Sequence, residues 1–144
     1  MTDNTATTRW TGDLKSGSGA LSLDTSGAAE FIVSFPARTG ETHDQTNPEE
    51  LIAAAHSTCL AMNFTGVLGR NELDATSVDV TSTVTLGKSG DGLAITGIAL
   101  LLEADVPGLE EAKFQELAEE AERTCPVSKA LAGTDITLTA KLSG

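Results

Sequence analysis

The two cysteines, Cys59 and Cys125, are the residues best suited to redox chemistry in this chain. Cys125 precedes Pro126, where a new helix is expected to begin, and a helix N-terminus favours the thiolate form of a cysteine. Arg123 and Lys129 add positive charge nearby. Cys59 falls within an apolar helix, which raises the pKa of a thiol unless a cation reaches it. Local sequence alone therefore favours Cys125 as the more reactive thiol.

Two cysteines are too few for the disulfide framework of a small secreted domain. The first nine residues, MTDNTATTR, contain no apolar segment of the kind found in secretion signals. We therefore expect a cytoplasmic protein with reduced thiols. An inert role for both cysteines stays open, because free cysteine is often buried and packs like a small apolar residue.

His56 and Asn63 share the helical face of Cys59, at spacings of three and four residues. His56 could pair with a thiolate, although a buried histidine is more often a satisfied structural group. A zinc site is another alternative, and its ligands would be His56, Cys59 and Cys125, with Glu49 or His43 as the fourth. The chain lacks Cys-x-x-Cys and paired-histidine spacing, so we expect no metal and no cofactor.

The charge balance narrows the classes of partner. Nine Lys and Arg residues stand against twenty-one Asp and Glu residues, which gives a net charge of −12. Such a field repels phosphate backbones and anionic lipid heads, so we expect neither nucleic acid nor membrane as a partner. The length of 144 residues, 40% of them hydrophobic, predicts one domain over residues 1–144.

A long helix must carry Cys59, and its start is well marked. Asn47 can serve as N-cap, Pro48 suits the first helical position, and Glu50 completes a box-like arrangement three residues after the cap. The pattern predicts a helix through Leu68, with Gly69 as its stop.

This helix has no charged residue between Leu51 and Gly69, and apolar residues cover nearly every angle around its axis. The pattern predicts a helix that is buried all round. The apolar run is long enough for a membrane span to be considered, because about 20 apolar residues cross a bilayer. The many alanines and the polar residues His56, Ser57, Thr58 and Asn63 argue against it. A central helix wrapped by sheet, from this chain or a second copy, explains the same pattern.

Strands and two further helices complete the expected order βββ-α-ββ-αα-β. Three short strands, at residues 8–13, 19–24 and 30–35, are expected to form a meander, with Gly17, Gly19, Gly27 and Gly40 at turns. Residues 77–86 and 93–104 read as a hairpin with its turn at 87–92. Residues 109–124 have the apolar stripe Phe114, Leu117, Ala118 and Ala121 of a helix. A short helix at 126–131 and a strand at 135–142 follow, and the whole is an antiparallel α+β domain.

Two runs carry a resemblance to a known family. The run Thr46 to Cys59 (TNPEELIAAAHSTC) and the run Cys125 to Lys129 (CPVSK) resemble the osmotically inducible branch of the OsmC/Ohr hydroperoxide reductases. The resemblance extends from WTGD, beginning at Trp10, to the closing ITLTAKL segment, and so covers almost the whole chain. It implies an OsmC-like fold with antiparallel sheets around a long buried central helix, in an intertwined homodimer.

The resemblance also implies a thiol peroxidase that acts in defence against oxidative and osmotic stress. The family's first cysteine matches Cys59, whose thiolate attacks an organic hydroperoxide and becomes a sulfenic acid. The second matches Cys125, which condenses with that acid to a disulfide, and a dithiol such as a lipoylated protein reduces it. The resemblance thus assigns the first attack to Cys59 rather than Cys125, and we follow it.

The family's arginine and glutamate map onto Arg38 and Glu49. Arg38 would hold Cys59 as thiolate and polarise the peroxide, while Glu49 would fix the guanidinium through a planar two-bond contact. Without the resemblance, the preferred interpretation of Arg38 and Glu49 is a surface residue and a carboxylate in the first turn of a helix. On one continuous helix, Glu49 and Cys59 are roughly 15 Å apart along the axis. Either Glu49 serves the Cys59 of a second subunit, or the helix is broken between them.

A different class of function also fits the fold that the resemblance implies. A fold can outlive its chemistry, so the chain could be a ligand-binding or stress-interaction protein without significant peroxidase turnover. The two readings differ in one observable, which is whether a hydroperoxide removes both thiols as a disulfide forms.

Overall fold

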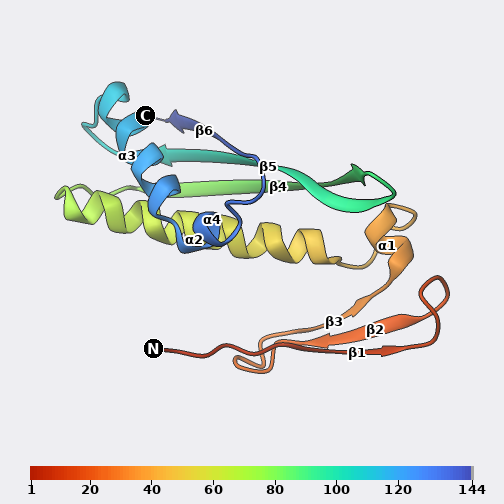
Figure 1. Ribbon diagram of the computed structural model, residues 1–144. Coiled ribbons are helices and arrows are strands. Elements are labelled where there is room, and N and C mark those ends of the chain that lie inside the picture. Colours follow the sequence, from red (N-terminus) through yellow and green to blue (C-terminus); the bar gives the residue numbers. More distant parts are fainter. Residues whose placement is uncertain (144) are drawn as a thin grey trace. The chain divides into compact units, whose positions relative to one another are not determined.

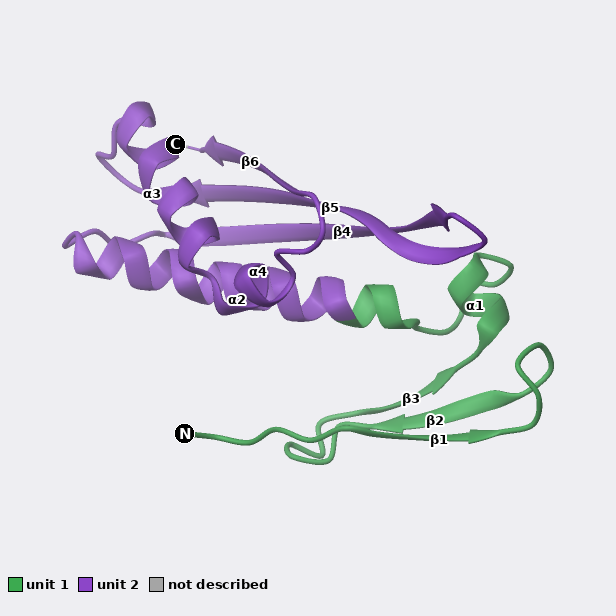
Figure 2. Ribbon diagram, in the orientation of Figure 1, with its two compact units in different colours: residues 1–51 green, residues 52–144 purple. Residues whose placement is uncertain are grey.

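The computed structural model of this chain describes residues 1–143 and contains two compact units. The first unit is Met1–Leu51, and the second begins at Ile52 (Figure 2). One domain over residues 1–144 therefore stays a prediction.

The first unit contains a small sheet followed by a short helix. Its elements are β1 (Thr7–Thr11), β2 (Ser18–Ser22), β3 (Glu30–Val33) and α1 (Phe35–Thr39) (Figure 1). The strands pair antiparallel in the order β1-β2-β3, which confirms the predicted meander.

Gly19 lies inside β2 and not at a turn, contrary to the sequence expectation. It faces Trp10 across the β1–β2 pair. A Cβ atom at Gly19 would come within 2.8 Å of Val33 Cγ2 and 2.9 Å of Thr8 Cγ2. The glycine therefore makes room for side chains of both neighbouring strands, a requirement that outweighs its poor strand propensity.

The helix α1 was not predicted, because Phe35 reads as the end of a strand. Ser34 caps this helix, and its hydroxyl accepts a hydrogen bond from the backbone N–H of Ala37 at 3.3 Å. Pro36 suits the first turn, and Gly40 ends the helix with φ at 81°. The Ser-x-Pro start and the following glycine are the local signals of this helix.

The long helix α2 (Pro48–Arg70) begins where the sequence predicts. The side chain of Asn47 accepts a hydrogen bond from the Glu50 backbone N–H at 2.9 Å, as an N-cap does. The Glu50 carboxylate in turn accepts a hydrogen bond from the Thr46 hydroxyl. The helix runs past Gly69, the expected stop, and ends one residue later.

Burial around α2 is one-sided in the single chain, whereas the sequence predicts burial all round. Leu60, Phe64 and Val67 have no exposed surface, yet Met62 is 71% exposed. The helix is long and apolar enough by composition to cross a membrane, a test that core helices of soluble proteins also meet. Its buried side belongs to the core of the second unit, as expected of such a core helix.

The second unit places its helices against a three-stranded sheet. Its remaining elements are β4 (Ser77–Ser89), β5 (Gly92–Asp105), α3 (Glu111–Thr124), α4 (Pro126–Ala130) and β6 (Ile136–Leu142). The pair β4–β5 is the predicted hairpin, with strands that extend further into the expected turn. Apart from the additional helix α1, the order of elements is the predicted one. This order and the mixture of helices and strands confirm the α+β fold class.

One strand pair departs from the antiparallel expectation. β6 pairs with β5 in parallel, and the sheet order is β4-β5-β6. The physical reason is the connection: α3 and α4 lie between the two strands in the chain and return it to the same end of the sheet.

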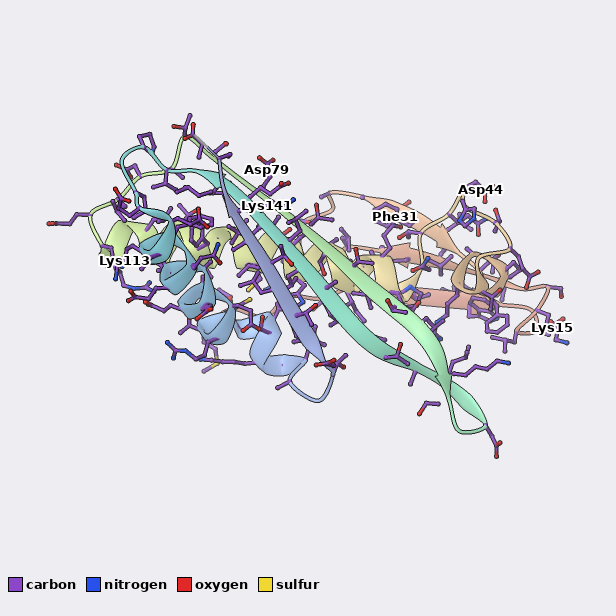
Figure 3. All side chains as sticks on the ribbon, turned by 90° about the horizontal axis from the view of Figure 1, so that it is seen from above. Lys15, Phe31, Asp44, Asp79, Lys113 and Lys141 are labelled. Atoms are coloured by element: carbon purple, nitrogen blue, oxygen red, sulfur yellow. The ribbon has the colours of Figure 1, made fainter. Side chains whose placement is uncertain are left out.

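The core of the second unit lies between the sheet and helices α2 and α3. Figures 1 and 3 show α2 running along one face of the sheet, while Asp79 and Lys141 project from its strands. Phe64 of α2 and Phe114 of α3 meet edge to face, with ring centroids 5.6 Å apart. The predicted stripe of α3 is confirmed, since Phe114 and the rest of it are buried. The core thus fixes α2 relative to α3 and the segment that follows it.

Candidate active site

The two cysteine sulfurs lie side by side. Cys59 is on α2, Cys125 precedes α4, and their Sγ atoms are 3.1 Å apart although 66 residues separate them in sequence. Both thiols are free. Cys125 is completely buried, whereas Cys59 is half-buried. A disulfide has a bond length of about 2.05 Å, so these two sulfurs need to approach by roughly 1 Å to bond.

The break between α3 and α4 positions Cys125. Pro126 disfavours helical geometry at the preceding residue, and Cys125 is accordingly extended, with φ −60° and ψ 122°. It is the N-cap of α4, as the sequence predicts, but its side chain makes no capping hydrogen bond. The thiol points instead to Cys59, and α4 has only five residues.

The pKa of the Cys59 thiol is raised above its ordinary value. Burial is the largest cause, and the hydrogen bond and charge of the neighbouring Cys125 sulfur act in the same direction. A weaker opposing influence comes from the backbone of Val127. The second unit therefore holds the two thiols together without promoting ionisation of the one expected to attack.

Arg38 and Glu49 form the two-bond contact that the resemblance implies. Arg38 Nη2 donates to Glu49 Oε1 at 2.8 Å, and Arg38 Nε donates to the same oxygen at 3.1 Å and to Oε2 at 3.3 Å. The side chain of Glu49 is only 8% exposed, whereas that of Arg38 is 38% exposed. The carboxylate thus fixes a guanidinium that still reaches solvent.

Local structure in the first unit holds this ion pair in place. Arg38 lies in the last turn of α1, and Glu49 lies in the first turn of α2. The connecting loop is tied down by Ser34, whose hydroxyl donates to Gln45 Oε1 at 2.7 Å. The Asn47 side chain also donates to the carbonyl of Ala37. The arginine is therefore held by a capped turn and a helix start.

A cavity of about 140 Å³ lies beside Arg38 in the first unit. Its lining includes five apolar side chains, those of Trp10, Leu14, Val33, Phe35 and Pro48. A guanidinium at the edge of an apolar cavity suits a molecule with one polar end and one hydrocarbon end.

Helix α2 is continuous from Glu49 to Cys59, which answers one question left open by the sequence. Ten residues of unbroken α-helix rise about 15 Å along the axis. The alternative of a break between Glu49 and Cys59 is therefore wrong.

His56 has a structural partner and belongs to no metal-binding group. Its Nε2 atom lies 2.8 Å from the hydroxyl of Ser128, and its ring is completely buried. Among residues 1–143, no three His, Cys, Asp or Glu side chains gather as metal ligands. Asn63, on the same helical face, donates hydrogen bonds to the end of α3. The sequence places His56 and Asn63 on the face of Cys59, but their partners are visible only in the fold.

Two curated relatives cover most of the chain. The first is a peroxiredoxin OsmC from Escherichia coli (strain K12), 40% identical over 122 residues, which are 85% of each protein. The second is an organic hydroperoxide resistance protein from Xanthomonas axonopodis pv. citri (strain 306). It is 35% identical over 102 residues, which are 69% of this chain and 70% of that protein.

The fold and the family model agree with these relatives. The crystal structure of an organic hydroperoxide resistance protein from Elizabethkingia anophelis superposes with a TM-score of 0.79 at 29% identity. That match covers 99% of this chain and 98% of the other. The family model for OsmC-like proteins matches residues 40–141, a segment that includes Glu49, Cys59 and Cys125. The chain therefore belongs to the family of OsmC-like proteins.

Proposed function

We propose that this protein is a thiol peroxidase that reduces organic hydroperoxides to alcohols in stress defence, with Cys59 and Cys125 as its redox pair. The names of its relatives support a peroxidase-type role. The observation that carries the proposal is the 3.1 Å separation of two free sulfurs from distant parts of the chain. Its two units would then act together as one OsmC-like domain over residues 1–144.

The proposed cycle has three balanced steps. The Cys59 thiol attacks the O–O bond of ROOH, so that Cys59–SH and ROOH become Cys59–SOH and ROH. The Cys125 thiol then attacks the sulfenic sulfur, and Cys59–SOH and Cys125–SH become a disulfide and water. A dithiol reduces that disulfide by two exchange steps and is itself oxidised to a disulfide.

Arg38 and Glu49 would supply the activation that the second unit lacks. Because burial raises the pKa of Cys59, a nearby cation is needed to stabilise its thiolate at neutral pH. The Glu49 carboxylate orients Arg38 through the planar contact, which suits a guanidinium that must face both a thiolate and a peroxide. The apolar cavity beside Arg38 suits the hydrocarbon part of the substrate.

An intertwined homodimer is the arrangement that we propose for these parts. With α2 unbroken, Glu49 and Arg38 of one chain would serve Cys59 of the second. The exposed side of α2 supports this, because Met62 is 71% exposed and, with Ala61, Ala75 and Val78, lines an apolar groove. A twofold interface would cover this exposed apolar surface.

The reductant and the compartment follow from the same chemistry. A disulfide that must be reopened in each cycle needs a dithiol donor, such as a lipoylated protein, and a compartment in which thiols stay reduced. We therefore place the protein in the cytoplasm. Its charge of −12 disfavours nucleic acid and anionic membrane as alternative partners.

The direct test is thiol titration during reaction with cumene hydroperoxide. We expect one equivalent of hydroperoxide to remove both thiols of each chain, with one disulfide and one equivalent of the alcohol formed. Peptide mapping should place that disulfide between Cys59 and Cys125. Thiols that persist in excess hydroperoxide would refute the peroxidase proposal and favour a ligand-binding or stress-interaction protein of the same fold.

A further inference from the structure

Two polar cross-links flank the cysteine sulfurs within the second unit. On one side, Asn63 Nδ2 donates to the carbonyl of Ala121 at 2.7 Å and to the hydroxyl of Thr124 at 2.8 Å. On the other side, His56 Nε2 lies 2.8 Å from the hydroxyl of Ser128. We call these two cross-links the clamp.

The spacing of the clamp residues matches the spacing of the cysteines. On α2, His56 precedes Cys59 by three residues and Asn63 follows it by four, so the two lie one turn to either side. Opposite them, Thr124 directly precedes Cys125 and Ser128 follows it by three. Each cross-link thus joins α2 to the segment of Cys125, and the two sulfurs lie between the cross-links.

In the Asn63 part of the clamp, the side-chain amide nitrogen uses all its hydrogen-bonding capacity. Both N–H groups of the amide are used, one on Ala121 and one on Thr124. The Thr124 hydroxyl donates its own proton to the carbonyl of Glu120 at 2.7 Å, so it accepts from Asn63. A side chain with both donors occupied by two fixed acceptors has one orientation, and it therefore fixes the end of α3 against α2.

The His56–Ser128 contact is buried, and this burial lowers the stability of the fold. His56 is completely buried and Ser128 nearly so, and His56 Nδ1 has no hydrogen-bond partner among residues 1–143. A buried polar group without a partner destabilises a fold, and an apolar side chain would fill the same space without that cost. What the histidine supplies is a directional link to α4, a five-residue helix that begins directly after Cys125.

We propose that Asn63 and His56 are positioning residues that hold Cys125 against Cys59, so that disulfide formation outruns a second oxidation of Cys59. This inference rests on the proposed peroxidase cycle. In that cycle the sulfenic acid has two fates: condensation with Cys125–SH releases water, whereas a second ROOH converts Cys59–SOH to Cys59–SO₂H and ROH. Holding the thiol within about 1 Å of bonding distance favours the first fate through proximity.

The test measures how strongly the folded chain favours the disulfide. The full-length protein is equilibrated in buffers of reduced and oxidised glutathione, and the Cys59–Cys125 disulfide is quantified by mass spectrometry. The variants are Asn63→Ala and Ser128→Ala, which remove one cross-link each and leave both cysteines in place. The matched control is Asn71→Ala, because Asn71 also donates from its side chain to a backbone carbonyl of α2, that of Val67 at 2.9 Å.

We expect the effective concentration of the two thiols to fall about tenfold in Ser128→Ala, as for loss of one hydrogen bond, and at least as far in Asn63→Ala, which loses two. In Asn71→Ala the effective concentration should stay within about twofold of that in the unchanged chain, even where this variant loses as much thermal stability as the clamp variants do. A second readout is the hydroperoxide concentration at which half of Cys59 becomes sulfinic acid. That concentration should fall by a similar factor in both clamp variants and stay constant in Asn71→Ala.

The glutathione titration contains no hydroperoxide, so its result is separate from the fate of the peroxidase proposal. Effective concentrations that are equal in the unchanged chain and in both clamp variants would overturn the proposed positioning role of Asn63 and His56. An equal fall in Asn71→Ala would also overturn it, because the effect would then follow general stability. If Asn63→Ala does not fold, Ser128→Ala decides the question alone.

Discussion

The cysteine pair and the Arg38–Glu49 pair differ in nearly every physical respect. The cysteine pair lies in the second unit against an apolar core, and burial raises the pKa of Cys59. The arginine and glutamate lie in the first unit, oppositely charged, with the guanidinium partly exposed at the edge of a cavity. Each pair is complete within its own unit: the sulfurs contact each other, and the guanidinium contacts its carboxylate.

This division shows how an apolar environment and a thiolate can be combined. A core that brings two sulfurs within 3.1 Å also disfavours ionisation, because it removes water from the thiol. A cation built into that core would itself be costly to bury. In the proposed dimer, a guanidinium carried on a separate unit, with a buried carboxylate to orient it, would avoid that cost until the two pairs meet.

The largest effect should come from the nucleophile. Replacing Cys59 by Ser should reduce hydroperoxide consumption by at least about 10³-fold, since a hydroxyl at neutral pH does not replace a thiolate as attacking group. Replacing Cys125 by Ser should leave the first turnover intact and stop later ones. Rapid-mixing assays with one equivalent of hydroperoxide separate the two variants.

The Cys125→Ser chain should also accumulate a sulfenic acid at Cys59 that a dimedone probe labels. Its absence, together with full activity in the Cys59→Ser chain, would reverse the order of the two thiols. Cys125, whose position at a helix N-terminus favours the thiolate, would then be the attacking thiol.

The next effect should come from the ion pair. Replacing Arg38 by Met should slow the first turnover about 10²-fold, by removing the cation that stabilises the thiolate and the developing oxyanion. Glu49→Gln should cost about tenfold, because the arginine remains but is held less firmly. In Arg38→Met the rate should climb as pH rises, since higher pH forms more thiolate from a thiol whose pKa burial has raised.

Mixing inactive chains tests whether the pair acts between subunits. Refolding Cys59→Ser chains together with Arg38→Met chains should restore about a quarter of the sites, because half of the dimers are mixed and each has one complete site. Activity that stays at the level of the separate variants would show that both pairs must come from one chain.

The elements of this fold differ in how far local sequence predicts them. The start of α2 is predictable because its capping interactions act within one turn of Asn47. The hairpin β4–β5 is predictable because alternating residues flank a glycine-rich turn. The parallel pairing of β6 is not, because it depends on where α3 and α4 return the chain.

The candidate site also has parts that local sequence predicts and parts that depend on tertiary packing. Local sequence marks Cys125 as the start of a helix but gives no signal that its sulfur meets Cys59, which depends on the packing of α3 against α2. Only the family resemblance predicts that meeting. The Arg38–Glu49 contact depends on α1, whose Ser34 cap reads as part of a strand until the helix is seen. Side-chain partners such as Ser128 for His56 appear only with the tertiary structure.

The smallest predicted effect is a dependence of stability on pH through His56. Burial lowers the pKa of this histidine below its ordinary value of 6.5, and the negative charge of Glu122 opposes the shift only partly. The unfolded chain therefore binds a proton at a higher pH than the folded chain, so stability falls as pH drops below 6.5 and levels off below the folded pKa.

Chemical denaturation between about pH 7.5 and pH 5.5 measures how the free energy of unfolding depends on pH. His56→Phe should remove on the order of 1 kcal/mol of the loss of stability seen in the unchanged chain. The matched control replaces exposed His43 by Phe, which should leave the slope with pH as it is. A steeper slope in His56→Phe than in the unchanged chain would mean that His56 is charged in the folded state. The cysteine pair would then have a cation of its own one helical turn away, and its contrast with Arg38 and Glu49 would disappear.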